Sequence, residues 1–125
     1  MILNLTDLSD EPLQSQIARQ VRAKILTGEL SAGVPLPSIR ALAREQQVSV
    51  ITVQRAYEHL LRENLIHSRR GKGFFVSELP QDRKRDMAEE RLIENVKRPV
   101  LDAMAEGMTT KEIQRVIGEI LKRMQ

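Results

Sequence analysis

The sequence predicts a mostly α-helical chain with one small β-hairpin, built as an N-terminal domain followed by a short helical region. Three observations predict this fold class. Apolar residues recur at helical spacing in five stretches. Two glycines and three cations crowd one bend between two strand-like segments, and the chain becomes charged and helical after Pro80. We therefore expect two parts, residues 1–78 and residues 79–125.

The composition of the 125 residues argues against several classes of protein. The chain is 41% hydrophobic and 30% charged, and no apolar run approaches the roughly 20 residues of a membrane span. The first ten residues lack the basic start and long apolar stretch of a signal peptide. There is no cysteine and there are two histidines, too few for a multi-histidine metal site. We expect a cytoplasmic protein without a cofactor, a metal or a membrane partner.

Three helices are expected in the first part. Pro12 opens the first helix, which Gly28 ends. The segment S-A-G-V-P-L-P-S is a stiff connector, because its two prolines exclude a helix. A second helix runs from about Ser38 to Glu45. Ser49 then caps a third helix, which Asn64 ends.

A tight hairpin is expected after the third helix. Ile66–Arg69 and Phe74–Ser77 read as strands around R-G-K-G, where glycines allow positive φ angles. Two short strands are marginally stable alone, so the hairpin must pack on the helices. Phe75 and Val76 are the expected anchors.

The second part is expected to hold two helices. One runs from about Gln81 to Ala105, and Pro99 should kink it or split it. Gly107 caps its end. Thr109, three residues before Glu112, forms a capping-box pattern that opens the final helix.

The order of elements in the first part is that of a winged helix-turn-helix. In this fold the exposed N-terminal part of the third helix can enter a DNA major groove. The hairpin, or wing, can lie over the neighbouring strand backbone or the minor groove. There Arg69, Arg70 and Lys72 would meet phosphate charge. The net charge of +3 proves little alone, so the inference depends on this local placement.

Four motifs resemble the DNA-binding domain of GntR-type bacterial transcription regulators. They are L-P-S-I-R-A-L-A, V-S-V-I-T-V-Q-R-A-Y, L-I and R-R-G-K-G-F-F-V, within a match over roughly residues 10–77. The short tail is similar to that of the YtrA subfamily, whose members dimerise through a small two-helix C-terminal part. The resemblance implies a sequence-specific regulator, most often a repressor.

The resemblance also implies which residues contact DNA. Arg40 matches a phosphate- or base-contacting arginine, and Ser38 lies near the DNA backbone. Ser49 and Thr52 match recognition-helix positions, and Gly71 lies at the wing tip between Arg70 and Lys72.

At three further recognition-helix positions the sequence departs from the wider family. The operator sequence of other family members therefore cannot be assigned to this chain. Gln54 could pair with an adenine edge, and Val50 or Ile51 could contact a thymine methyl group. Phe74 replaces a smaller polar residue, and no effect is assigned to it.

The final helix predicts a homodimer. Its six apolar side chains contribute about 1.5–3 kcal/mol each when buried, and a layer of two helices leaves them exposed. Pairing two chains through their tails would bury them and present two heads to a palindromic operator on double-stranded DNA. The predicted dimer residues are Leu92, Val96, Val100, Leu101, Met104, Ile113, Val116, Ile117, Ile120, Leu121 and Met124.

Other functions remain as alternatives. The strongest is a winged-helix module used for protein–protein assembly rather than DNA reading. Binding of RNA or of single strands lacks a stacking platform, since Tyr57, Phe74 and Phe75 are the only aromatic residues. An enzyme is not expected, because no nucleophile–base pair or phosphate loop is found. The sequence leaves a small-molecule effector open and does not identify one.

Overall fold

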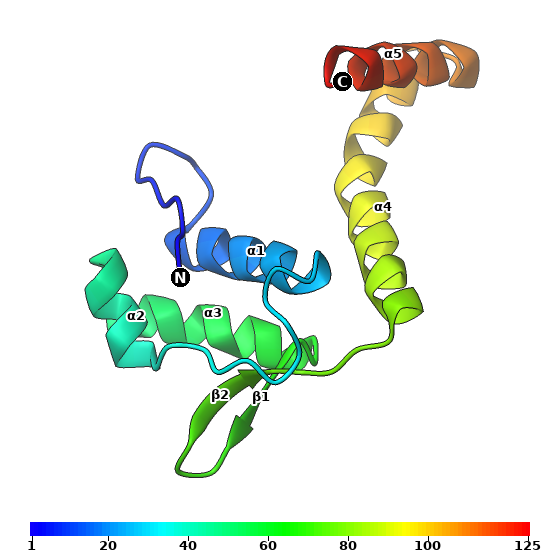
Figure 1. Cartoon of the computed structure of the whole chain (residues 1–125). Coiled ribbons are helices and arrows are strands. Elements are labelled where there is room, and N and C mark those ends of the chain that lie inside the picture. The colour runs from blue at the N-terminus through cyan, green and yellow to red at the C-terminus, as the bar shows by residue number, and fades with distance from the viewer. The chain divides into compact units, whose positions relative to one another are not determined.

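The computed structural model describes all 125 residues and contains five helices and one antiparallel hairpin (Figure 1). The predicted fold class is confirmed. The chain divides into two compact units, Met1–Lys84 and Arg85–Gln125, here called the head and the tail. No helix combines the length and the apolar content that crossing a bilayer requires. The elements are α1 (Leu13–Leu26), α2 (Ile39–Gln46), α3 (Val50–Arg62), β1 (Ile66–Arg69), β2 (Gly73–Val76), α4 (Gln81–Ala105) and α5 (Thr110–Arg123).

The core of the head lies around α3, which packs against both α1 and α2. Ile17 and Val21 of α1, Leu42 of α2, and Val53 and Leu60 of α3 are fully buried. These residues are the apolar stripes that helical spacing predicts. Figure 1 shows α1 on one side of α3 and the hairpin on the other.

Side-chain caps and left-handed residues set the bounds of α2 and α3. The Oγ atoms of Ser38 and Ser49 accept the backbone N–H groups three residues later, at 3.1 Å each. Gln47 ends α2 with φ 56°, and Asn64 follows α3 with φ 60°. The predicted roles of Ser49 and Asn64 are confirmed, whereas Ser38 was predicted only as the start of the second helix. That helix ends at Gln46, one residue beyond the predicted end.

The connector before α2 extends the hairpin on its second edge. The Gly33 N–H donates to the Val76 carbonyl at 2.8 Å, the Val76 N–H donates to Val34 at 2.9 Å, and the Leu36 N–H donates to Phe74 at 2.9 Å. The predicted stiff connector therefore acts as a short third strand. It covers an edge of β2 that would otherwise be open.

The anchor of the wing differs from the prediction. Phe74 packs edge-on against Tyr57 of α3, with ring centroids 5.0 Å apart. Phe75 lies on the opposite face of the strand, where it stacks on His67. Because side chains alternate along a strand, Phe75 and Val76 cannot both face the helices. Phe74 and the buried Val76 are the anchors.

A buried glutamine holds the N-terminal lead-in against α1. Gln16 accepts the Thr6 N–H at 3.0 Å and donates to the carbonyls of Thr6 and Glu11, at 2.8 Å each. Gln20 pairs in the same way with the backbone of Asn4, at 2.7 Å in both directions. These contacts order a segment that the sequence predicts only as extended.

In the tail, α4 runs through Pro99 as the one helix predicted over Gln81 to Ala105. Of the two alternatives expected at Pro99, a kink or a split, the split is therefore excluded. Gly107 follows α4 with φ 98°, as its predicted capping role requires. The capping box at α5 is confirmed. Thr109 Oγ1 accepts the Glu112 N–H at 3.2 Å, and Glu112 Oε1 accepts the Thr109 N–H at 2.9 Å.

Candidate nucleic-acid interface

The first turn of α3 exposes apolar side chains next to hydroxyl groups. Val50 is 47% exposed and Ile51 is 50% exposed, although both belong to a helix that otherwise buries its apolar stripe. The hydroxyls of Ser49 and Thr52 lie 2.8 Å apart at the same helix start. A helix N-terminus favours an anion, and exposed methyl groups beside it can contact a thymine methyl.

The second turn of α3 exposes Gln54. Its Nε2 donates to Glu58 Oε1 one turn later, at 3.3 Å. The amide therefore has one hydrogen bond within the protein, while its oxygen and its second N–H remain available to a ligand.

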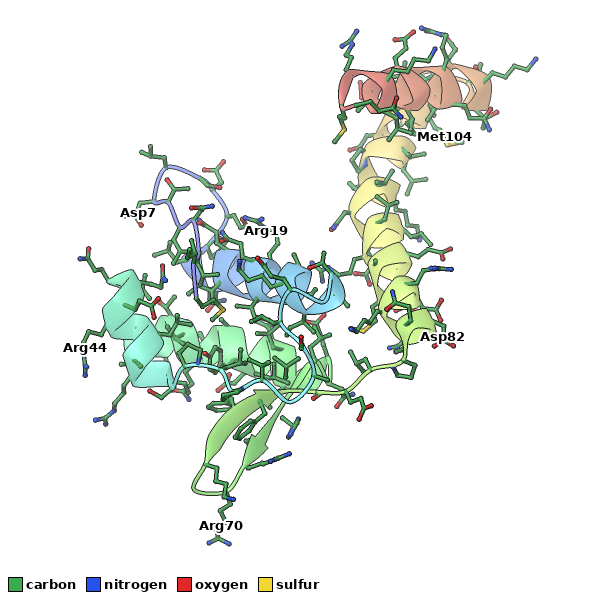
Figure 2. All side chains as sticks on the ribbon, in the orientation of Figure 1. Asp7, Arg19, Arg44, Arg70, Asp82 and Met104 are labelled. Carbon is green, nitrogen blue, oxygen red and sulfur yellow. The ribbon has the colours of Figure 1, made fainter.

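The hairpin ends in a tight basic turn. The Lys72 N–H donates to the Arg69 carbonyl at 2.9 Å, and Gly71 and Gly73 have φ angles of 75° and 101°. Such angles favour glycine, which explains why two glycines flank Lys72. Arg70 extends from the tip of the hairpin, away from the helices (Figure 2). The Arg69 guanidinium lies 4.8 Å from the centroid of the Phe75 ring, so the arginine is held along the wing.

Arg40 lies close to the start of α3. Arg40 and Arg44 of α2 line one shallow depression together with Val50. Figure 2 shows Arg44 pointing outward from α2. The structure thus brings the predicted Arg40 beside the predicted Val50.

A buried tyrosine holds the connector that precedes α2. The Tyr57 hydroxyl donates to the Pro37 carbonyl at 2.7 Å, and its side chain is almost fully buried. Burial, with a smaller contribution from Glu45, raises the pKa of Tyr57 well above its ordinary value, so the hydroxyl stays a donor. The helical spacing of Tyr57 from Val53 and Leu60 predicts a place in the core of the head, but nothing in the sequence indicates the bond to Pro37.

The ten cations between the start of α1 and the end of the wing fall into two groups. Arg19 pairs with Glu11 at 3.0 Å, Lys24 pairs with Glu29 at 3.1 Å, and Arg22 pairs with Glu63. The hydrogen bond from Arg19 lowers the pKa of the Glu11 carboxyl. All three of these cations belong to α1. Seven cations of α2, α3 and the wing form no ion pair. Arg62 contacts His59 Nδ1, and the other six are Arg40, Arg44, Arg55, Arg69, Arg70 and Lys72.

This division creates a basic surface at the predicted DNA contacts. The head carries twelve Lys and Arg against nine Asp and Glu, whereas the tail carries eight of each. The whole net charge of +3 therefore belongs to the head. Cations without carboxylate partners are free to neutralise phosphates.

The tail holds an apolar groove of about 500 Å³ between α4 and α5. Nine of the eleven predicted dimer residues line it. The other two, Leu101 and Met104, are exposed outside the groove, as is Ile93, which the prediction omitted. The groove also contains Asn95, Pro99, Ala103 and Met108, which were not predicted.

Residues 13–76, about half of the chain, match the family described as "Bacterial regulatory proteins, gntR family". The match spans α1 through the end of β2 and thus includes every candidate DNA-contacting residue. This chain belongs to the gntR family. It is accordingly a DNA-binding transcription regulator with a winged helix-turn-helix, as the resemblance predicted.

Three relatives show how far the similarity to gntR proteins extends. The HTH-type transcriptional repressor YtrA of Bacillus subtilis is 30% identical over 122 residues, which cover 95% of this chain and 92% of YtrA. The structure of a GntR family transcriptional regulator from Listeria monocytogenes is 27% identical with a TM-score of 0.69, covering 92% of this chain and 98% of that one. The DNA-binding domain of AraR, solved in complex with operator ORR3, is 25% identical with a TM-score of 0.50 and covers 61% of this chain and 95% of that one.

The first two relatives include the tail, which supports the YtrA subfamily within the gntR family. The curated relatives of this chain are named as transcription regulators, several of them repressors. The roles of individual side chains in the head, and the pairing of the tails, stay predictions.

Proposed function

We propose that this chain is a homodimeric repressor that binds a palindromic operator. In each head, α3 enters the major groove and the wing follows the neighbouring backbone. The observation that carries this proposal is that α3 exposes its first turns while six cations of α2, α3 and the wing form no ion pair, two of them beside Val50. Base contacts would come from Val50, Ile51 and Gln54, and phosphate contacts from Ser38, Arg40, Ser49, Thr52, Arg69, Arg70, Gly71 and Lys72.

The relatives support the same proposal. YtrA is named a repressor, and the AraR domain was solved on its operator. A regulator of this kind acts on chromosomal DNA, which supports the expected cytoplasmic location.

The tail supports the dimer. Ile117, Ile120 and Leu121 project into the groove from α5 and remain exposed in the single chain. A second copy supplies the same apolar surface, as a two-fold interface requires. The equal numbers of cations and anions in the tail mean that two tails do not repel each other through net charge.

Two linked heads bind more tightly than one. After the first half-site is bound, the second contact is intramolecular, and avidity can exceed the single-site affinity by about 10²–10⁴-fold. We expect weak binding to an isolated half-site.

Operator selection from random duplexes, followed by titrations at several salt concentrations, tests this proposal. Arg70→Gln should weaken binding to all duplexes and flatten the log–log salt slope by about one, because one phosphate contact is lost. Arg19→Gln removes the same charge from α1, where Glu11 already pairs with it, and should leave the slope unchanged.

The alternative of a protein-assembly module predicts a different outcome. If full-length protein selects no sequence and binds no duplex at low salt, the proposed repressor function is wrong. Arg70→Gln and Arg19→Gln would then behave alike.

A further inference from the structure

Glu58 is the only carboxylate in α3, and it is exposed on the helix proposed to enter the major groove. Arg55 and Arg62 lie three residues before it and four residues after it, yet Glu58 forms no ion pair. Arg62 instead contacts His59 Nδ1 at 2.9 Å. The hydrogen bond that Glu58 makes is the one it accepts from Gln54 Nε2, at 3.3 Å.

A carboxylate on a helix that faces DNA repels phosphates of every sequence. On this surface Glu58 stands against six cations without ion pairs, so its charge opposes the binding that they favour. The charge of Glu58 therefore does not explain its presence on this surface, whereas a contribution to the choice of DNA sequence would.

The chemistry of the two side chains indicates what that contribution is. A glutamine amide has a donor side and an acceptor side, and an ionised carboxylate only accepts. The bond to Glu58 therefore keeps the nitrogen of Gln54 toward Glu58 and excludes the flipped amide, whose oxygen would face the carboxylate. A bidentate contact with adenine needs one donor and one acceptor in a fixed order.

We propose that Glu58 is a positioning residue that fixes the orientation of the Gln54 amide and thereby determines which base Gln54 reads. This inference rests on the proposed function, because it requires α3 to lie in the major groove. An amide already held in the reading orientation loses less conformational freedom on binding, which is the general advantage of preorganisation.

The test compares wild type, Gln54→Ala, Glu58→Ala, Glu58→Asp and the double variant Gln54→Ala/Glu58→Ala. Each full-length protein is titrated with the selected operator and with duplexes that carry every base at each position. Gln54→Ala should reduce the preference at one position by roughly 5- to 150-fold, the range of a bidentate contact. Glu58→Ala should reduce the preference at the same position by at least about 2-fold, since an amide free to flip is competent half of the time.

Glu58→Asp separates the effect of the hydrogen bond to Gln54 from the effect of the negative charge. It keeps the negative charge but shortens the side chain, so the bond to Gln54 is lost. We expect its preference to fall to that of Glu58→Ala, while its affinity for non-specific DNA stays at the wild-type value. A wild-type preference in Glu58→Asp would show that charge alone matters and would overturn the inference.

The double variant separates positioning from direct reading, since Glu58 could itself accept from a cytosine amino group. If Glu58 acts through Gln54, Glu58→Ala causes no further change of preference once Gln54 is alanine. An equal change in both backgrounds would overturn the inference, as would an unchanged preference in Gln54→Ala. Failure of the wild-type protein to bind any duplex would instead overturn the proposed function, so the two failures are distinguishable.

Discussion

The head and the tail differ in how they use their apolar residues. Fifteen apolar residues are buried in the head and two in the tail. The tail, with half as many residues, nevertheless exposes eight large apolar side chains against four in the head. Two of the four in the head are Val50 and Ile51, at the proposed DNA surface.

This difference indicates that the two units reach stability by different routes. The head surrounds α3 with two helices and a hairpin, so most of its apolar surface is covered within one chain. The tail has two helices, each of which can cover only one side of the other. A large exposed apolar surface of this kind marks an interaction site. We therefore expect the head to fold alone and the tail to need a partner.

Removal of the tail should have the largest effect on operator affinity and on the oligomeric state. A chain ending at Lys84 should remain folded and become monomeric, and its affinity for the full operator should fall by about 10²–10⁴-fold because avidity is lost. Sedimentation gives the mass, circular dichroism the fold, and titration the affinity. An isolated head that stays dimeric would place the interface in the head and contradict the comparison.

A charge in the groove should separate the dimer without removing the tail. Leu121 is 58% exposed in the single chain and lines the groove. Leu121→Asp would remove about 2 kcal/mol of apolar burial from each of two subunits, which corresponds to roughly 1,000-fold weaker dimerisation.

Lys111→Gln is the matched control for Leu121→Asp, since it makes the same one-unit change of net charge at an exposed residue of α5 that does not line the groove. Light scattering over a concentration series measures both dissociation constants. Equal constants for the two variants would mean that the groove does not form the interface.

An ion pair within the head should matter for stability rather than for DNA binding. Arg22 is only 7% exposed, and its Nε donates to Glu63 Oε2 at 3.0 Å, which links α1 to the end of α3. Arg22→Ala should lower the free energy of unfolding by about 2–3 kcal/mol, because a charge-assisted contact is lost next to the core. Urea unfolding measures this change. Arg19→Ala, whose partner Glu11 is at the surface, should change stability by less than about 1 kcal/mol.

Local signals explain what could be predicted from the sequence. The caps Ser49 and Thr109 depend on side chains that bond to the backbone three residues later, so their effect can be predicted from the spacing. The wing turn is readable for the same reason, because glycine marks positive φ angles.

Contacts between distant segments had no such signal. The pairing of Val34 with Val76 joins residues far apart in the chain, and a proline-containing connector does not look like a strand. The alternation in β2 determined that Phe74 faces Tyr57, but the sequence alone did not show which face is inward. The ion pairs of Arg19, Arg22 and Lys24 likewise follow from the packing, so composition alone could not separate them from the cations of the proposed interface.

The smallest expected effect is a loss of helix stability caused by a substitution at the start of α5. Thr109→Ala removes the cap that accepts the Glu112 N–H and should destabilise the helix by about 1 kcal/mol. The backbone N–H of Thr109, followed by its hydroxyl, lowers the pKa of the Glu112 carboxyl. A carboxyl with a lowered folded-state pKa stabilises the helix above its unfolded-state pKa, and this stabilisation is lost as the pH falls through the folded-state pKa.

Acid titration should therefore isolate the contribution that the Glu112 carboxylate makes to the capping box. Circular dichroism of the wild type should show helix loss on acidification, whereas Glu112→Gln, which cannot ionise, should lack that component at every pH. If the tails pair as proposed, burial of α5 in the dimer will mask most of the loss at high protein concentration. The loss should then appear mainly in Leu121→Asp, whose tail is single. An equal acid response in wild type and Leu121→Asp at all concentrations would contradict the view that α5 depends on a second copy.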